Sequence, residues 1–219
     1  MTYVAGDLRD QLAHVGQAVV QAGLVVGSGG NLSARRPGAD ECWVSAAGTW
    51  LDRLDRPAFV RVRISDGAPM DTSNSVDRAP TSELGLHLAT YRARPEVNAV
   101  VHLHPQAVLL LDALDAPIRL ISTDHIFYLR RIATAPFHPP GTPAVGASAA
   151  AACADGTNCV VLSRHGCSVL GTTVELAHKR ALYLEEAARM TYRALAAGRL
   201  GDITDCPNDW LDEPGRHSV

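Results

Sequence analysis

The sequence predicts one domain of the α/β or α+β class. Stretches with the periodicity of helices and of strands are interspersed along the chain, which is the pattern of these two classes. The length of 219 residues, with 47% hydrophobic and 20% charged residues, suits one globular domain. No internal repeat or linker divides it. We therefore expect one domain over residues 1–200 and a polar C-terminal tail over residues 201–219.

The first third of the chain predicts one helix and two strands. Apolar residues recur at helical spacing over residues 7–23, between an aspartate that can cap the helix and a glycine that can end it. A glycine-rich break follows. A short strand is expected over residues 41–45 and a half-buried strand over residues 59–64, where side chains alternate between two faces. Residues 67–80 are expected to form a polar loop.

The rest of the chain alternates between the two kinds of element. The middle predicts a helix over residues 82–94 capped by Ser82, a strand over 97–104, a helix over 106–114, a strand over 118–122 and a loop over 133–146. The last part predicts a short helix over residues 147–154, a buried strand over 158–163 and the longest helix over 172–197.

Charge and composition exclude several classes of function. The net charge is −3 and no basic face is evident, which argues against a nucleic-acid partner. The longest apolar runs are far shorter than the roughly 20 residues that span a bilayer, so we expect no membrane partner. The five cysteines form no paired motif, and no signal peptide is visible at the N-terminus. Together these features predict a cytoplasmic protein.

Two histidines on one predicted strand are the clearest local signal. His102 and His104 are two residues apart, so the period of a strand places both imidazoles on one face. Such a pair can occupy two positions around one metal ion. His165 follows another predicted strand and could complete a three-histidine site with an open position for substrate. Taken singly, these residues could also be strand or turn histidines that bind nothing.

Two further features point to chemistry only in combination. Glu83 lies where a helix is expected to begin, and free backbone N–H groups there attract anions. On its own, Glu83 is better explained by its favourable interaction with the helix dipole. Glycines within residues 27–31 allow a backbone to approach a ligand oxygen closely. This segment lacks the glycine patterns of nucleotide-binding loops.

Four separated segments together resemble a known family. The segments read GSGGNLSAR, VSAAGTWLDRL, APTSELGLHLATYRARPEVNAVVHLHP and VLSRHGCSVLGTTVELAHKRALYLEEAA. Their order and spacing are similar to those of the class II aldolase/adducin family, from about residue 8 to residue 197. The resemblance implies a three-layer α/β/α fold with a central, mostly antiparallel sheet, and a C4 homotetramer with each metal site near a subunit interface.

The resemblance also assigns roles to residues. It implies one divalent metal ion per subunit, usually Zn²⁺, with Mn²⁺, Co²⁺ or Fe²⁺ as alternatives. The implied ligands are His102, His104, His165 and Glu83, and Glu83 is also the acid/base of the reaction. The residues that the family uses to hold the substrate's phosphate correspond to Asn31, Gly48, Thr81 and Ser82.

The chain departs from the family at two places. Ala47 stands where a hydroxyl residue is expected before Gly48, which removes one phosphate donor, although Ser45 or Thr49 could compensate. The aldolases also use a tyrosine in the stretch that here reads STDHIFYLRR, and a second one near the C-terminus. Neither is present at the expected place. The candidate proton donors are therefore Asp124, His125 and Tyr128.

These residue types suit chemistry beside a carbonyl. A divalent cation stabilises an enediolate as a Lewis acid, and Glu83 would move a proton at the adjacent carbon. The leading hypothesis is an aldolase that cleaves a ketose 1-phosphate, such as fuculose phosphate, to dihydroxyacetone phosphate and an aldehyde. A decarboxylase of a 3-oxo-tetronate 4-phosphate or similar keto acid is the first alternative, and a sugar-phosphate dehydratase uses the same chemistry. A non-catalytic adducin-like scaffold and a three-histidine oxygenase remain as alternatives of other classes.

Overall fold

A computed structural model describes residues 3–70 and 78–212 of the chain. Its strands are β1 (Asn31–Ala34), β2 (Glu41–Ser45), β3 (Phe59–Arg63), β4 (Ala99–Leu103), β5 (Ile132–Ala135), β6 (Cys159–Leu162) and β7 (Gly166–Gly171). Its α-helices are α1 (Leu8–Gln21), α2 (Leu84–Ala93), α3 (Gln106–Ala113), α4 (Thr123–Leu129), α5 (Pro143–Cys153) and α6 (Val174–Ala196). Short 3-10 turns are formed by Leu51–Arg53, Arg56–Ala58, Leu200–Asp202 and Asp209–Asp212.

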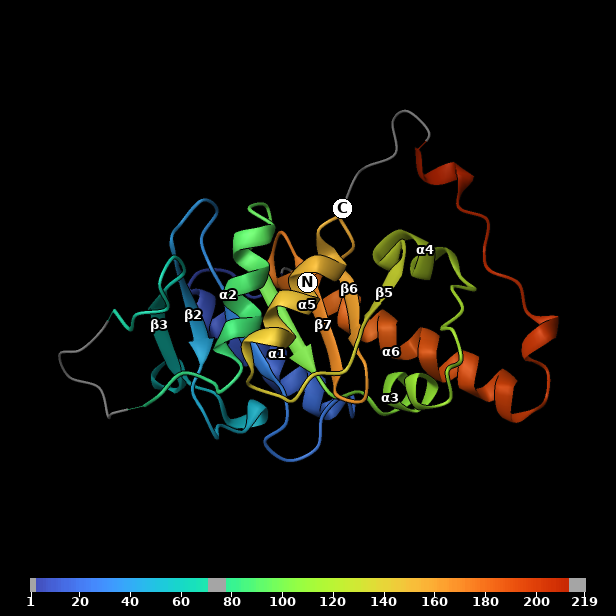
Figure 1. Cartoon of the computed structure of the whole chain (residues 1–219), viewed down its shortest axis with the longest axis horizontal. Helices are drawn as coiled ribbons and strands as arrows, with labels where there is room; N and C mark the ends of the chain where they lie inside the picture. The colour runs from blue at the N-terminus through green and yellow to red at the C-terminus, as the bar shows by residue number, and fades with distance from the viewer. Residues whose placement is uncertain (1–2, 71–77, 213–219) are drawn as a thin grey trace.

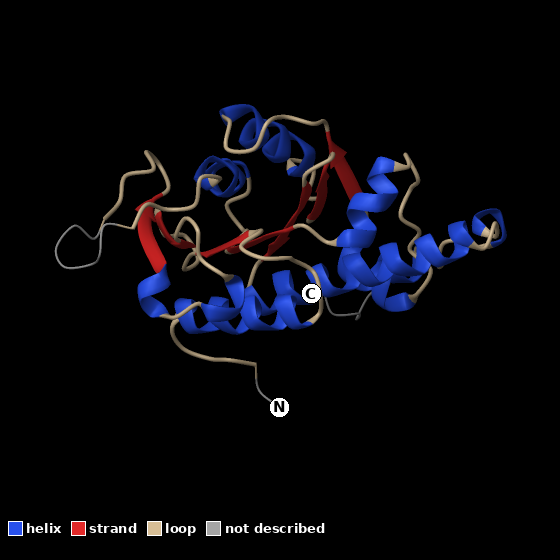
Figure 2. Ribbon diagram, turned by 90° about the horizontal axis from the view of Figure 1, so that it is seen from below, coloured by secondary structure: helices blue, strands red, loops and turns tan. Residues whose placement is uncertain are grey.

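One mixed sheet forms the middle layer. Within the described residues it has seven strands in the order β3-β2-β1-β4-β7-β6-β5 (Figure 1). Every neighbouring pair is antiparallel except β5 and β6, which are parallel. Helices cover both faces of this sheet (Figure 2). The predicted three-layer α/β/α fold with a mostly antiparallel sheet is therefore confirmed.

The two faces of the sheet bury separate apolar cores. On one face, helices α1, α3 and α6 pack on alternate residues of β4, namely Ala99, Val101 and Leu103. On the other face, Val100 packs with residues of α2 and α5. His102 lies two residues beyond Val100, so it faces the α2 side of the sheet.

Helix boundaries follow local capping chemistry. The Asp7 side chain accepts a hydrogen bond from the backbone N–H of Arg9 and caps α1, as predicted. The predicted Ser82 cap of α2 is wrong. Glu83 occupies the capping position without a side-chain cap bond, because a turn formed by Thr81 precedes the helix: its carbonyl accepts from the Leu84 N–H.

Two predicted segments differ from the structure. Residues 118–122 are not a strand of the sheet, because Leu120 makes its backbone hydrogen bonds with Asp205 and Cys206 instead. The predicted loop over residues 133–146 contains most of β5, which pairs with β6, and the start of α5, where Pro143 occupies the first turn. No helix in residues 3–70 or 78–212 is long and apolar enough to cross a membrane.

Candidate metal centre

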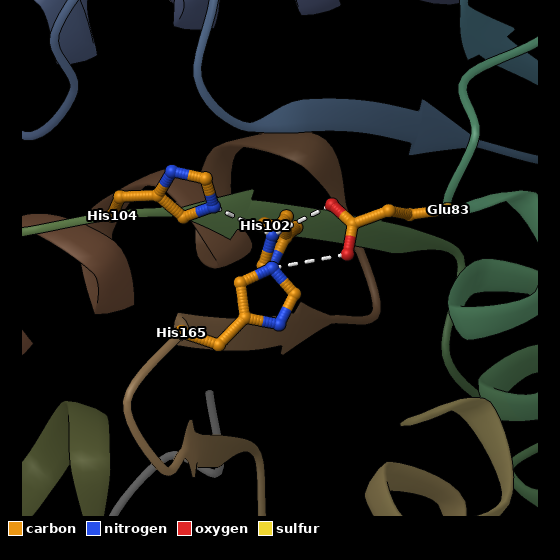
Figure 3. Close-up of side chains that lie close together, drawn as sticks. All are labelled: Glu83, His102, His104 and His165. Carbon is orange, nitrogen blue, oxygen red and sulfur yellow. Dashed lines mark hydrogen bonds and ion pairs between the residues drawn. The ribbon is translucent and has the colours of Figure 1, made fainter. Parts of the chain in front are cut away.

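Four side chains from distant parts of the sequence converge on the α2 side of the sheet. Glu83, His102, His104 and His165 each offer a ligand atom, and these atoms all lie within 4.8 Å of one another (Figure 3). The Glu83 carboxylate lies 3.0 Å from Nε2 of His102 and 3.1 Å from Nε2 of His165. Nε2 of His102 lies 3.1 Å from Nε2 of His104. The arrangement could hold one metal ion.

The sheet register explains this convergence. His102 is on β4, and His104 lies just beyond the end of that strand. His165 lies in the turn between β6 and β7, and β7 pairs with β4. The turn fits only because residue 166 is glycine. A Cβ there would lie 2.3 Å from the carbonyl oxygen of Leu103 and 2.6 Å from the His104 ring.

The protonation of the cluster suits a cation. Nδ1 of His102 donates to the carbonyl oxygen of Cys167 at 2.9 Å, which directs Nε2 toward the cluster. Burial lowers the pKa of His104 to about 4, so this imidazole is neutral. Burial raises the pKa of Glu83, but contacts with His102, His165 and Asn31 more than offset this, and the pKa lies well below its usual range.

The donor set fits a divalent ion. Glu83 Oε1 is buried and lies 3.1 Å from His165 Nε2, which directs this carboxylate oxygen into the cluster. Neutral imidazole nitrogens facing an ionised carboxylate are the ligands of zinc and of several other transition metals. Nε2 of His102 and Nε2 of His104 are too close together for both to direct a proton at the other. A divalent cation would supply the missing positive charge.

Two of the predicted phosphate-binding residues adjoin Glu83. Nδ2 of Asn31 donates to Glu83 Oε2 at 3.0 Å, and the hydroxyl oxygen of Thr81 accepts from the Glu83 backbone N–H at 3.3 Å. Ser82 is exposed. Gly48 is also exposed, in a turn that is joined to the Thr81 segment by a hydrogen bond from the Ala47 N–H to the Ala79 carbonyl.

The hydroxyls that could replace the one missing at Ala47 differ in availability. Thr49 already donates its hydroxyl proton to the Ala46 carbonyl at 2.8 Å. Ser45 is buried, and its oxygen accepts from the Leu32 N–H, so its own proton is not used by that bond. Of the two, only Ser45 retains a donor.

The candidate proton donors lie on α4 and face α6. The Tyr128 ring stacks on Tyr183 with 4.6 Å between centroids. His125 is fully buried, and its Nε2 lies 3.4 Å from the Glu186 carboxylate. Asp124 also interacts with Tyr183. None of these three candidates belongs to the cluster found among the described residues.

The other histidines do not join the ligand set. The cluster includes none of His14, His87, His138 and His178, and His217 lies outside the described residues. Among these, His87 has surroundings that sequence reasoning missed. It is fully buried and hydrogen-bonded to Asn31 and Ser33. The four-residue spacing from Glu83, which places both on one side of a helix, was the available signal.

Comparison with known proteins identifies relatives of two activities. The chain is 30% identical over 168 residues to the L-fuculose phosphate aldolase of Methanococcus vannielii, covering 77% of this chain and 86% of that protein. It is 32% identical over 189 residues to the 3-oxo-tetronate 4-phosphate decarboxylase of Cupriavidus necator, covering 84% and 82%. Both of these relatives are named as enzymes.

The fold and a family model agree with these relatives. A solved L-fuculose 1-phosphate aldolase superposes with a TM-score of 0.79 over 96% of this chain and 95% of its own, at 22% identity, which shows a common fold. The model of the "Class II Aldolase and Adducin N-terminal domain" family matches residues 10–192. The chain is accordingly a member of the class II aldolase and adducin family.

Proposed function

We propose that this protein is a metal-dependent aldolase that cleaves a ketose 1-phosphate to dihydroxyacetone phosphate and an aldehyde. The observation that carries the proposal is the Glu83 carboxylate, which lies in the cluster of three imidazoles, 3.0 Å from Nε2 of His102 and 3.1 Å from Nε2 of His165. A carboxylate in this position can move a proton at a carbon beside a carbonyl. The L-fuculose phosphate aldolase relatives support this reaction class.

The bond changes of the cleavage balance without an oxidant. The carbon–carbon bond next to the ketone breaks, and its electron pair stays on the ketose-derived carbon. The hydroxyl on the departing carbon gives its proton to water as the aldehyde forms. Glu83 takes up a proton from solvent and delivers it to the ketose-derived carbon, so one proton is released and one is consumed. The same carboxylate removes that proton in the reverse direction, as the ordinary role of a general acid/base requires.

His102, His104 and His165 would hold the metal ion, with Glu83 as a fourth ligand in the resting enzyme. A bound divalent cation would supply Lewis-acid stabilisation of the negative charge that develops beside the carbonyl. Zn²⁺ suits three imidazoles and a carboxylate, and Mn²⁺, Co²⁺ and Fe²⁺ accept the same ligands. Adding each ion to metal-free protein, and measuring stoichiometry with turnover, identifies the active one.

The substrate's phosphate would occupy the loop side of the site. The Asn31 amide donates one of its two N–H bonds to Glu83, and the other N–H remains for a ligand. Thr81 and Ser82 precede α2, where the helix dipole favours an anion, and a Cβ added at Gly48 would meet nothing within 4 Å. These four residues form the proposed anion pocket.

One observation favours a second candidate, a decarboxylase of a 3-oxo-tetronate 4-phosphate or a similar keto acid. Aldol cleavage needs a base for the departing hydroxyl, and Asp124, His125 and Tyr128 contact α6 residues rather than the metal cluster. Decarboxylation of a 3-oxo acid needs no such base, because the carboxylate leaves as carbon dioxide. Relatives with this activity cover 84% of this chain or more.

A direct assay separates the two candidates. The metal-loaded protein is given a ketose 1-phosphate and a 3-oxo acid 4-phosphate in parallel, with trapping of the aldehyde and of carbon dioxide. The aldolase proposal expects aldehyde and dihydroxyacetone phosphate in equal amounts. Carbon dioxide from the keto acid, with no aldehyde from the ketose, would replace it with the decarboxylase. No stoichiometric divalent ion in protein purified without chelator, and no gain of stability from added zinc or manganese, would favour the scaffold alternative.

Three further parts of the proposal concern the whole molecule. We propose a C4 homotetramer with each metal site near a subunit interface, a cytoplasmic location, and a functional domain over residues 1–200. Light scattering at micromolar concentration tests the first, since a monomer contradicts it. Truncation after residue 200 tests the last. Asp205 and Cys206 bond to the Arg119–Leu120 segment, so loss of metal occupancy on truncation would extend the domain into these residues.

A further inference from the structure

A row of buried polar side chains lies between β1 and α2, where an apolar core would be the ordinary filling. The row consists of Asn31 and Ser33 from β1 and Glu83, His87 and Tyr91 from the α2 segment. The two strand residues are two apart and the helix residues four apart, so each set projects from one face of its element. All five are at most 8% exposed.

The row is joined by four hydrogen bonds. Tyr91 OH lies 2.7 Å from Ser33 Oγ, which lies 2.7 Å from His87 Nδ1. His87 Nε2 lies 2.5 Å from Asn31 Oδ1. Asn31 Nδ2 donates to Glu83 Oε2 at 3.0 Å. The row thus begins at a buried phenol and ends at the carboxylate of the candidate metal centre.

The carboxylate fixes the direction of every bond. Asn31 Nδ2 donates to the Glu83 carboxylate, so the Asn31 group that faces His87 is the carbonyl oxygen. His87 Nε2 must then donate to that oxygen. Burial lowers the pKa of His87 to about 3, so the ring is neutral and its Nδ1 accepts the Ser33 proton. Ser33 in turn accepts the proton of Tyr91, whose pKa is raised well above its usual value by burial.

A purely structural filling does not require this order. Burying two ring nitrogens at residue 87 has a desolvation cost that an apolar side chain would avoid. A buried polar network is costly unless every member makes its hydrogen bonds. Here every link is made, and reversing any one of them would place like groups together. The order of the bonds matters most for Asn31. Its carbonyl oxygen can face His87, with both amide N–H bonds pointing elsewhere, only while His87 Nε2 donates to that oxygen.

We propose that His87 is a positioning residue, which orients the Asn31 amide so that one N–H is held on Glu83 and the other is available to the substrate's anionic group. This inference rests on the proposed function. The Nε2-protonated ring is its structural requirement. Ser33 and Tyr91 support this arrangement. Ser33 donates to His87 Nδ1 and Tyr91 donates to Ser33, so the ring proton is held on Nε2.

The ring tautomer is measured first, because it needs no substrate. In the intact protein, labelled with ¹⁵N-histidine and loaded with Zn²⁺, long-range ¹H–¹⁵N spectra distinguish a protonated from an unprotonated ring nitrogen. His87→Gln identifies the resonance by its disappearance. We expect a protonated Nε2 and an unprotonated Nδ1 at neutral pH. A proton on Nδ1, or on both nitrogens, would overturn the proposal.

Substitutions then test the consequence. His87→Leu removes both ring functions, whereas the His87→Gln amide can still donate to Asn31 and accept from Ser33. With the ketose 1-phosphate, or the keto acid if that is the substrate, we expect His87→Leu to lower kcat/KM about 10- to 100-fold, as for loss of a hydrogen bond to a charged group. We expect His87→Gln to retain at least about a third of wild-type kcat/KM.

A matched control separates positioning from loss of packing. His178→Leu removes another buried imidazole, on α6, whose Nδ1 lies 3.3 Å from the Tyr3 hydroxyl. It should lower the melting temperature without lowering kcat/KM. Equal losses of kcat/KM in His87→Leu and His87→Gln, or no loss in either, would overturn the proposal. If His87→Leu does not fold, Tyr91→Phe and Ser33→Ala interrupt the row further from the site, and unchanged kcat/KM in both counts as the same negative result.

A substrate-free readout keeps this result distinct from the proposed function. The visible spectrum of bound Co²⁺ reports the geometry of its ligands. His87→Leu should change the spectrum of the Co²⁺-loaded protein because Glu83 loses its oriented donor, and His87→Gln should restore it. If wild-type protein turns over neither substrate, the proposed function fails, while the tautomer and the Co²⁺ spectra still decide the role of His87.

Discussion

The candidate site has two halves, and the chain builds them by different means. The three imidazoles come from β4 and from the turn between β6 and β7, so the sheet register sets their spacing. The proposed anion pocket comes largely from the exposed turn at Gly48 and from the segment before α2. The strand-borne half is therefore constrained by packing, whereas the loop-borne half can change without disturbing the sheet.

The difference between the two halves is consistent with the different reactions named for the relatives. Proteins similar to this chain over most of its length are named for different reactions. One is a sugar-phosphate aldolase and the other is a keto-acid phosphate decarboxylase. Both reactions develop negative charge beside a carbonyl, which a common metal half would serve. The substrates in these names differ in the group that leaves and in the position of the phosphate. The loop-borne half would have to accommodate these differences.

Glu83 joins the two halves, so changing it should have the largest effect. Glu83→Gln keeps the size of the side chain but removes the proton-transfer group and the negative charge in the cluster. We expect activity to fall about 10²- to 10⁴-fold, the usual contribution of a general acid/base. The measurement is kcat with metal content determined on the same sample.

Glu175→Gln is the matched control. This residue is also near the start of a helix, but it pairs with Lys179 on the surface of α6. It should leave activity unchanged. Activity of Glu83→Gln within about threefold of wild type would remove Glu83 from the acid/base role.

Two glycines compare the halves directly. In Gly166→Ala the new Cβ would meet the Leu103 carbonyl and the His104 ring, and we expect a loss of about 3 kcal/mol in the free energy of unfolding together with weaker metal binding. In Gly48→Ala the surroundings are open and only the positive φ of 71° opposes the change. We expect a loss of about 1 kcal/mol and unchanged metal binding.

Denaturant unfolding and metal titration of both variants provide the test. If Gly48→Ala weakens metal binding as much as Gly166→Ala does, the two halves are not independent. If neither variant weakens it, the turn that carries His165 is less constrained than its contacts indicate.

A carboxylate on α3 supports the metal half from behind. Asp112 accepts from the Ser163 hydroxyl at 3.0 Å and from the Arg164 N–H at 2.7 Å, and so holds the turn that carries His165. Asp112→Asn turns one acceptor into a donor. We expect about 1–2 kcal/mol of lost stability and roughly tenfold weaker metal binding, the scale of outer-shell substitutions.

Asp66→Asn is the control for this change, because Asp66 accepts similarly from the Ala68 N–H in an exposed turn that contributes nothing to the cluster. Its metal affinity should equal that of wild type. Metal titration of the two variants side by side distinguishes support of the His165 turn from a general effect of removing a turn carboxylate.

Sequence reasoning succeeded where a pattern is local. The long helix α6, the strand β2 and the pairing of His102 with His104 on one strand face follow from periodicities of 3.6 and 2. The family resemblance then supplied the antiparallel sheet. Glu83 and His165 entered the predicted site on the resemblance as well, since neither had a decisive local signal.

The missed elements lack such patterns. Strand β7 begins and ends with glycine and is buried on both faces, so it shows no alternation. Helix α4 has only seven residues, and its cap, the Ser122 oxygen accepting from the His125 N–H, was the available signal. The bond between His87 and Asn31 joins residues 56 positions apart, which no periodicity reveals.

The smallest expected effect belongs to the loop half, at Ala47. This residue is exposed, and its backbone N–H bonds to the Ala79 carbonyl, so a longer side chain can be added without disturbing a core. Ala47→Ser would add a hydroxyl donor beside Gly48, where the family resemblance expects one. We expect inorganic phosphate to bind up to about tenfold more tightly, which corresponds to ~1.4 kcal/mol. Metal affinity should not change, because the strand-borne half is untouched. The measurement is competitive inhibition by phosphate in both forms, with turnover of a phosphorylated and an unphosphorylated substrate as the comparison. Equal phosphate inhibition in the two forms, with no preference for the phosphorylated substrate, would mean that these loops serve another kind of substrate while the metal half remains in place.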